Sequence, residues 1–65
     1  MEPQIGEIWR DNRKDRYYLI VDIENDPIML ERGIEMLRYS ILRLDNSTID
    51  GAWIQFFDTY CQKVC

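Results

Sequence analysis

Polar and hydrophobic positions alternate with a period of two over residues 17–24, and this is the clearest structural signal in the chain. Aromatic and β-branched residues dominate the run, as they do in β-strands. One face carries four large apolar side chains, and the other carries Tyr18, Ile20 and two acidic residues. The pattern predicts a strand, and we expect the first set to point into the core: Tyr17, Leu19, Val21 and Ile23.

Other short segments with strand character flank this run. They are apolar-rich and separated by polar or turn-forming residues, and they occupy positions 5–10, 36–44, 52–56 and 61–64. Asp11 and Asn12 are turn formers within the charged segment 10–16, which is typical of a hairpin loop. Residues 45–51 predict a turn-rich connection, and residues 57–60 predict a single turn before the last strand.

The segment between residues 25 and 36 is ambiguous. Asp26 and Pro27 are a good helix start, because aspartate accepts hydrogen bonds at the N-cap and proline fits the first helical position. Gly33 then marks a stop. Apolar residues also recur at spacings of four and three from Leu30 to Leu44, which would suit one longer helix. Because Gly33 would lie inside that helix, we predict a short helical turn over residues 26–33.

A chain of 65 residues forms one domain, residues 1–65, with a small interior. Hydrophobic residues make up 46% of it, which is typical of a globular chain rather than a disordered one. The fold class predicted is mainly β: a small barrel of four to five strands with one short helical turn. The aromatic residues expected to fill its core are Trp9, Tyr17, Tyr39, Phe56 and Phe57.

The formal net charge of −4 excludes some partners. An acidic surface repels phosphates and anionic lipids, so we expect neither nucleic-acid binding nor membrane docking. It favours instead a protein partner with a basic surface. The sequence has no apolar run long enough to span a bilayer and no signal-peptide pattern at its start, so we expect a cytoplasmic location.

Candidate catalytic chemistry is sparse. There is no histidine, and the three glycines are isolated, so neither the commonest general base nor a phosphate loop is present. The sequence identifies no base for any of the candidate nucleophiles, which are Ser40, Ser47, Thr59 and Cys61. Two cysteines cannot complete a zinc site. We therefore predict no enzyme activity, no catalytic residues, no metal and no cofactor.

The two cysteines, Cys61 and Cys65, both lie at the end of the sequence. A disulfide framework would need more cysteines spread along the chain. We therefore expect Cys61 to be packed and Cys65 to be exposed. The alternative is a disulfide, or a metal site, shared between two copies.

Cations are concentrated in the predicted loop at residues 10–16, where two aspartates dilute them. Arginine pairs well with carboxylates because its planar group binds them through two hydrogen bonds. This loop is either a solvated hairpin or a patch that holds an acidic protein or a phosphate. Its candidate binding residues are Arg13, Lys14 and Arg16.

Aromatic side chains are the second group of candidates. Eight aromatics, together with the aliphatics, exceed what the interior of so small a chain holds. Tyrosine and tryptophan are enriched with arginine at interface hot spots. We expect three of them to be partly exposed and to contact a partner: Tyr18, Trp53 and Tyr60.

The end of the chain resembles the closing region of SH3-like domains. The residues that carry this resemblance are Gly51-Ala52-Trp53-Ile54, then Tyr60-Cys61 and Val64. The chain also resembles small SH3-like proteins of bacteriophage genomes, with its Gly6-Glu7-Ile8-Trp9 start, its Tyr18-Leu19-Ile20-Val21 strand and its Phe57-Asp58 pair. The resemblance implies that the predicted barrel is SH3-like.

A second resemblance covers only the first third of the chain. Gly6-Glu7-Ile8-Trp9, Arg16 and Leu19-Ile20-Val21 are similar to the opening of MazF/PemK-type toxins, which are SH3-like barrels that cleave RNA. Tyr17 stands where that family has a proline. This resemblance again implies a barrel, and it implies an RNA-directed role for Arg16 as an alternative function.

The sequence as a whole favours a non-enzymatic protein-binding module, a phage-encoded modulator or inhibitor of a host protein. Its acidic charge would steer it to a basic partner surface. One alternative is an RNA-binding or RNA-cleaving MazF-like module. Another is a structural subunit that assembles into a homo-oligomer, because an incompletely closed barrel leaves strand edges that can pair.

Overall fold

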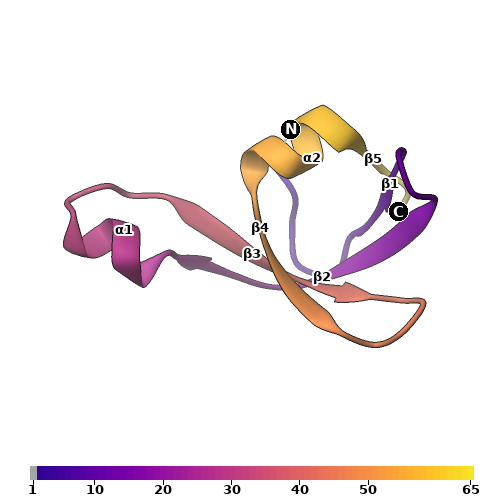
Figure 1. Ribbon diagram of the computed structural model, residues 1–65, viewed down its shortest axis with the longest axis horizontal. Coiled ribbons are helices and arrows are strands. Elements are labelled where there is room, and N and C mark those ends of the chain that lie inside the picture. The colour runs from indigo at the N-terminus through magenta and orange to yellow at the C-terminus, as the bar shows by residue number, and fades with distance from the viewer. Residues whose placement is uncertain (1) are drawn as a thin grey trace.

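Five antiparallel strands form a single sheet in the computed structural model, which describes residues 2–65 (Figure 1). The strand order is β4-β3-β2-β1-β5. Two short helices lie between strands. Strands hold more residues than helices do, so the mainly β class is confirmed. In chain order the elements are β1 (Ile8–Asp11), β2 (Arg16–Asn25), α1 (Pro27–Glu31), β3 (Leu37–Arg43), β4 (Ile49–Trp53), α2 (Ile54–Tyr60) and β5 (Cys61–Lys63).

The sheet is open. Strands β4 and β5 lie at its two edges, and within residues 2–65 no pairing joins them. Helix α2 connects one edge to the other and lies across the concave side of the curved sheet (Figure 1). The closed barrel expected from the sequence is therefore not confirmed. The short last strand predicted at residues 61–64 is confirmed by β5.

Strand β2 is present as predicted, but its faces were assigned wrongly. Ile20 is 1% exposed and Tyr18 is buried, whereas Tyr17 and Val21 lie in solvent. A period of two does not say which face is buried when both carry apolar residues. The pairing with β3 also contains a β-bulge at Val21, because Ile20 lies opposite Ile41 and Asp22 lies opposite Ser40. An extra residue in one strand reverses the alternation beyond it, which is why Ile23 also reaches the core.

The core is built from aromatic side chains packed edge to face. Phe57 of α2 is fully buried and meets Trp9 and Tyr39, with ring centroids 5.4 and 5.2 Å apart. Such pairs add about 0.5–1.5 kcal/mol each to the free energy of burial. Trp9, Tyr39 and Phe57 thus confirm the predicted core, Phe56 is half-buried, and the prediction for Tyr17 is wrong.

Helix α1 confirms the short helical turn predicted over residues 26–33. The carboxylate of Asp26 accepts hydrogen bonds from the backbone N–H groups of Ile28 and Met29, at 2.9 and 3.1 Å. Gly33 follows with φ of +77°, a conformation that glycine adopts without strain. The alternative of one long helix is wrong, because β3 pairs with both β2 and β4.

Beyond the bulge, β2 and β3 continue away from the body of the molecule and carry α1 at their far end, and β4 pairs with β3 as far as Arg38 (Figure 1). We call residues 22–38 the arm. The molecule is elongated as a result, with extents of 35 × 22 × 19 Å.

The predicted strand over residues 52–56 is wrong in its second half. Strand β4 ends at Trp53, and α2 begins at Ile54, so the single turn expected at residues 57–60 is a longer helix. The helix brings Phe57 into the core, a packing gain that outweighs the strand preference of aromatic residues.

Candidate functional site

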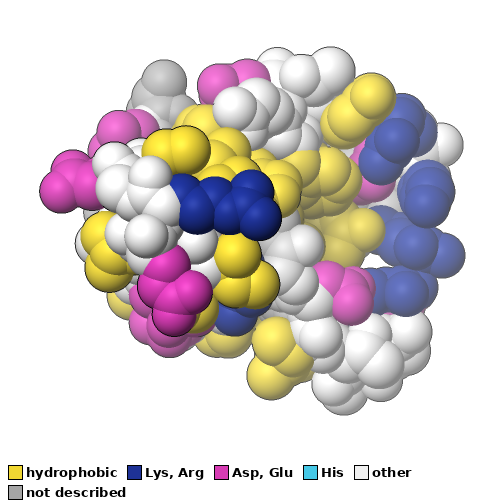
Figure 2. All heavy atoms as spheres, turned by 60° about the vertical axis from the view of Figure 1, so that its left-hand side comes forward, with side chains coloured by type: hydrophobic (Ala, Val, Ile, Leu, Met, Phe, Trp, Pro, Cys, Tyr) yellow, Lys and Arg dark blue, Asp and Glu magenta, His cyan; other side chains and the backbone are white. Residues whose placement is uncertain are grey.

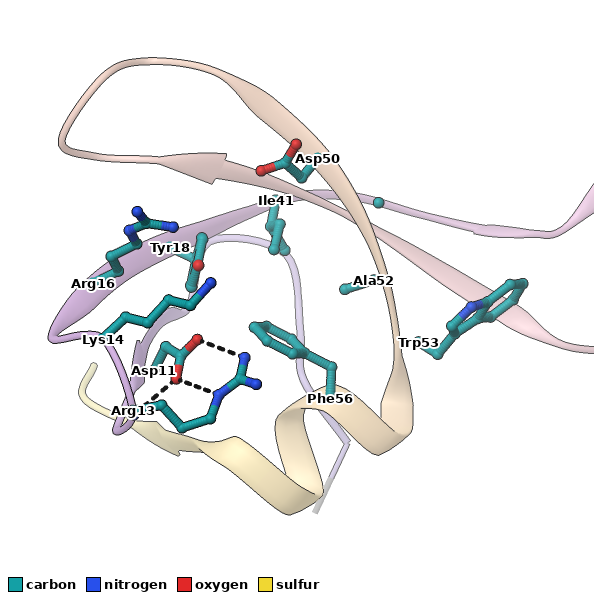
Figure 3. Close-up of a pocket in the computed structure, with 11 residues that line it drawn as sticks. Asp11, Arg13, Lys14, Arg16, Tyr18, Ile41, Asp50, Ala52, Trp53 and Phe56 are labelled. Atoms are coloured by element: carbon teal, nitrogen blue, oxygen red, sulfur yellow. Dashed lines mark hydrogen bonds and ion pairs between the residues drawn. The ribbon is translucent and has the colours of Figure 1, made fainter.

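A cleft of about 330 Å³ lies between the β1–β2 loop, residues 12–15, and the region where β4 leads into α2 (Figure 3). Its volume is at the small end of the range of about 300–1,000 Å³ that ligand sites occupy. The apolar part of its lining is Tyr18, Ile41, Gly51, Ala52, Trp53 and Phe56, and the charged part is Asp11, Arg13, Lys14, Arg16 and Asp50.

Asp11 anchors one wall of the cleft. It ends β1 on the same inward face as Trp9, and it is 0% exposed. Its side-chain Oδ1 accepts hydrogen bonds from the backbone N–H of Arg13 at 2.9 Å and from Arg13 Nε at 3.3 Å, while Oδ2 accepts one from Nη2 at 3.1 Å. These bonds hold the pKa of the Asp11 carboxyl below its usual value, although burial acts in the opposite direction.

Arg13 joins this carboxylate to α2. Its guanidinium lies 3.7 Å from the centre of the Tyr60 ring and 6.0 Å from that of Phe56, which are cation–π distances. The backbone carbonyl of Tyr60 also accepts a hydrogen bond from the N–H of Asn12, at 2.9 Å. The loop is therefore fixed to the end of α2, and Arg13 is engaged within the chain rather than free for a ligand.

Lys14 and Tyr18 supply polar groups that the rest of the chain does not use. The ammonium group of Lys14 extends into the cleft near Tyr18 (Figure 3). No ion pair is formed by Lys14, and no hydrogen bond by the Tyr18 hydroxyl, with any of residues 2–65. Phe56 points into the same space and meets Tyr18 edge to face at 5.8 Å.

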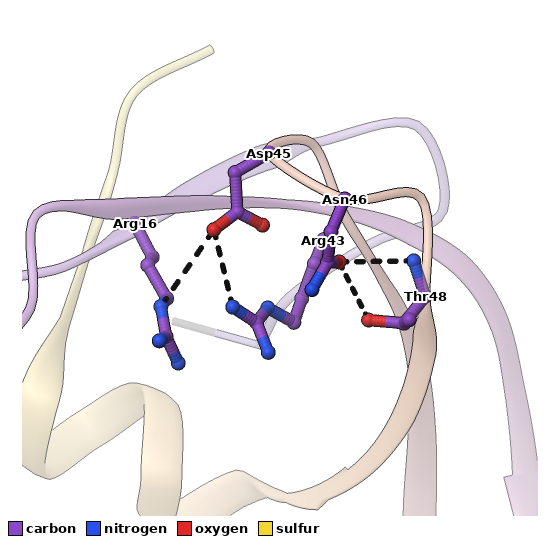
Figure 4. Close-up of polar contacts among 5 residues, drawn as sticks. All are labelled: Arg16, Arg43, Asp45, Asn46 and Thr48. Carbon is purple, nitrogen blue, oxygen red and sulfur yellow. Dashed lines mark hydrogen bonds and ion pairs between the residues drawn. The ribbon is translucent and has the colours of Figure 1, made fainter.

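Arg16 stands at the rim, where it is weakly held. Its Nε lies 3.8 Å from Oδ2 of Asp45, and the same oxygen accepts a 3.1 Å hydrogen bond from Arg43 (Figure 4). Asp50 lies on the facing rim and forms no ion pair within the described part of the chain. The cleft thus offers two cations on its loop side and one carboxylate opposite.

The structure brings together five of the six predicted binding residues, but not in the predicted way. The cleft is lined by five of them: Arg13, Lys14, Arg16, Tyr18 and Trp53. The sixth, Tyr60, is exposed beside the cleft, and its ring stacks on Arg13. The prediction that Tyr18 is partly exposed is wrong, because β2 presents its opposite face to the core. Trp53 contributes only to the edge, since its ring turns away from the cleft (Figure 3).

Sequence reasoning missed three residues that shape the cleft: Asp11, Asp50 and Phe56. Two of them left a signal. Asp11 stands two residues after Trp9, which puts both on one face of a strand. Trp53, Phe56, Phe57 and Tyr60 have the spacing of one helix face.

Groups suited to covalent or metal chemistry do not gather here. Among residues 2–65, no three side chains of the metal-ligating types come close enough to hold an ion. The candidate nucleophiles lie outside the cleft lining. Both thiols are free, Cys65 is exposed, and burial of Cys61 raises its pKa to about 11, so that this thiol stays protonated at neutral pH.

Comparisons with protein-family models, with curated proteins and with solved structures found no match for this chain. A separate observation bears on membranes: within residues 2–65, neither helix is long and apolar enough to cross one. The geometry of the cleft is therefore the basis of the functional argument.

Proposed function

We propose that the chain is a non-enzymatic protein-binding module whose cleft takes an acidic residue and a neighbouring apolar side chain from a partner protein. One observation carries this proposal. The Lys14 ammonium group extends into the cleft beside Tyr18 and Phe56, and it has no carboxylate partner among residues 2–65. Lys14 is itself an exposed residue, so we expect its charge to select a carboxylate while the apolar surface beside it supplies the rest of the binding energy.

The size of the cleft defines the ligand. A space of about 330 Å³ has room for one or two side chains, not for an extended interface. Arg16 at the rim and the Tyr18 hydroxyl at the floor are placed to bind the oxygens of a carboxylate. Phe56, Ile41 and Ala52 supply the apolar surface beside them.

The fold we propose is the SH3-like one. The strand order, and a helix between the last two strands, support it. The resemblance to small phage proteins of this kind supports a role as modulator or inhibitor of a host protein. A basic partner surface would meet the acidic arm rather than the cleft, because residues 22–38 contain five acidic residues and two arginines.

A fluorescence anisotropy titration tests the cleft. The probe is a labelled peptide that contains glutamate between leucine and phenylalanine, and the matched control peptide has lysine in place of glutamate. We expect the acidic peptide alone to bind. Lys14→Glu should weaken its binding more than about tenfold, because the ligand then faces a like charge.

Arg32→Glu is the control variant. Arg32 is exposed in the arm and does not line the cleft, and this substitution changes the charge by the same amount as Lys14→Glu. The affinity of this variant for the acidic peptide should stay within about twofold of wild type, because only a screened long-range attraction is lost. Tyr18→Phe keeps the packing and should weaken binding modestly by removing one hydroxyl. Equal binding of both peptides, or an unchanged affinity in Lys14→Glu, would contradict the proposal.

An RNA-directed module is the second candidate, and one observation favours it. Cations beside Tyr18 and Phe56 also suit a stacked base with its phosphate. A labelled RNA of mixed sequence in the same titration separates the two. Binding of this RNA in preference to the peptide, with cleavage lost in Arg16→Ala, would replace the first proposal with this one.

A further inference from the structure

The arm carries an apolar surface that the core does not use. No side chain of α1 is buried, and Ile28 is 64% exposed, with Leu30 and Ile34 also exposed. Three large apolar side chains exposed within seven residues of a small protein favour a contact site. The arm is therefore shaped to meet another surface.

Charge specifies what that surface is. Residues 22–38 have a net charge of −3, whereas residues 10–16, which form the loop side of the cleft, have a net charge of +2. Figure 2 brings the arm forward and shows acidic and hydrophobic side chains on the near face, with Lys or Arg atoms across its middle and a row of Lys and Arg side chains along one side. The molecule is thus acidic and apolar at one end and basic beside its cleft.

We infer that the arm of one copy docks in the cleft of a second copy. Ile28 would enter the cleft against Phe56, and Glu31, one helical turn further on, would face Lys14 with Glu35 near Arg16. This inference rests on the proposed function, because the arm is itself an acidic, apolar segment of the class proposed as ligand. It names that ligand as part of this same chain.

A copy does not fill its own cleft. Pairing of β2 with β3 continues to Asn25 and Leu37 and holds α1 at the far end of the arm, away from α2 (Figure 1). Each copy therefore offers one arm and one cleft. Such a contact joins different surfaces of two copies, so it is head-to-tail and can extend beyond a dimer.

Sedimentation velocity tests the inference on the full chain, from micromolar concentrations up to about 1 mM, the range in which small interfaces associate. We expect the average mass to rise with protein concentration and to fall when salt is raised, because salt screens exposed charges.

Charge reversal identifies the two surfaces. Glu31→Lys with Glu35→Lys changes the arm, and Lys14→Glu with Arg16→Glu changes the cleft. Either pair should weaken association by about tenfold or more, because like charges then meet. All four substitutions in one chain should restore it, since opposite charges face each other again. Glu2→Lys with Asp58→Lys is the control, with the same charge change on exposed residues outside both surfaces, and it should keep the association.

Two outcomes would overturn the inference: a wild-type chain that stays monomeric throughout, or a fourfold variant that associates no better than the arm variant. The peptide titration keeps this separate from the proposed function. A monomeric chain that binds the acidic peptide loses the inference and keeps the function, whereas a chain that binds no peptide loses the function.

Discussion

Asp11 is the residue on which the geometry of the cleft depends most. It is a fully buried carboxylate, and its compensating cation, Arg13, comes from the loop that the carboxylate itself organises. Arg13 in turn stacks on Tyr60 of α2. One side chain at the end of β1 therefore fixes the loop that presents Lys14 to the cleft.

Asp11→Asn should lower the free energy of unfolding by about 2 kcal/mol, because buried hydrogen bonds to a charged group are lost. Asp15→Asn is the matched control in the same loop. The Asp15 side chain is exposed and pairs with Arg10 at the surface, so its loss should cost under about 1 kcal/mol. Urea unfolding at neutral pH measures both changes. Equal effects of the two substitutions would show that Asp11 is not an anchor.

The same pair has a pH signature. The pKa of Asp11 is lower in the folded chain than its usual value of 3.8. The unfolded chain therefore binds this proton first, so the contribution of Asp11 is present above about pH 4 and is lost as pH falls through the folded pKa. In wild type, stability should fall more steeply below pH 4 than in Asp11→Asn.

At the scale of elements, local signals were enough for α1 and not for β2. Asp26, Pro27 and Gly33 specify the start and end of α1 through their own backbone chemistry. The strand character of β2 was also readable from its residues. The bulge at Val21 was not, because it is set by the pairing of β2 with β3, which a period-two pattern in one strand does not contain.

The burial of β2 makes a sharp prediction about two neighbouring residues. Ile20→Asp should unfold the chain, because an unpaired buried carboxylate costs several kcal/mol, roughly the whole stability of a small domain. Val21→Asp should change the free energy of unfolding by less than about 1 kcal/mol, because this side chain lies partly in solvent. Thermal unfolding followed by circular dichroism measures both. If the two effects were reversed, Val21 would lie in the core, as expected from the sequence.

Pairing and packing between distant segments also explain why the sequence predicted only part of the cleft. Arg13, Lys14 and Arg16 were predicted as a group because they are neighbours in sequence. Phe56 was predicted to be one of the aromatic core residues and to end a strand over residues 52–56. Its position in the cleft depends on α2, which forms because Phe57 fills the space between Trp9 and Tyr39. Contacts between distant segments decide such positions.

At the scale of the molecule, the charge is unevenly distributed. The net charge of −4 describes a chain whose arm is acidic and whose loop beside the cleft is basic. A net charge steers encounter from a distance, but the local groups decide what is bound. The net charge of the chain therefore favours a basic partner, whereas the cations of the cleft favour an acidic ligand.

The central claim is that the cleft binds acidic, apolar protein segments. Titration of ¹⁵N-labelled protein with the glutamate-containing peptide, followed by two-dimensional ¹H–¹⁵N correlation spectra, tests it most directly. We expect the shift changes to include the residues of the cleft: Lys14, Arg16, Tyr18 and Phe56. Changes confined to the arm, or to the outer face around Trp53 and Arg38, would contradict it.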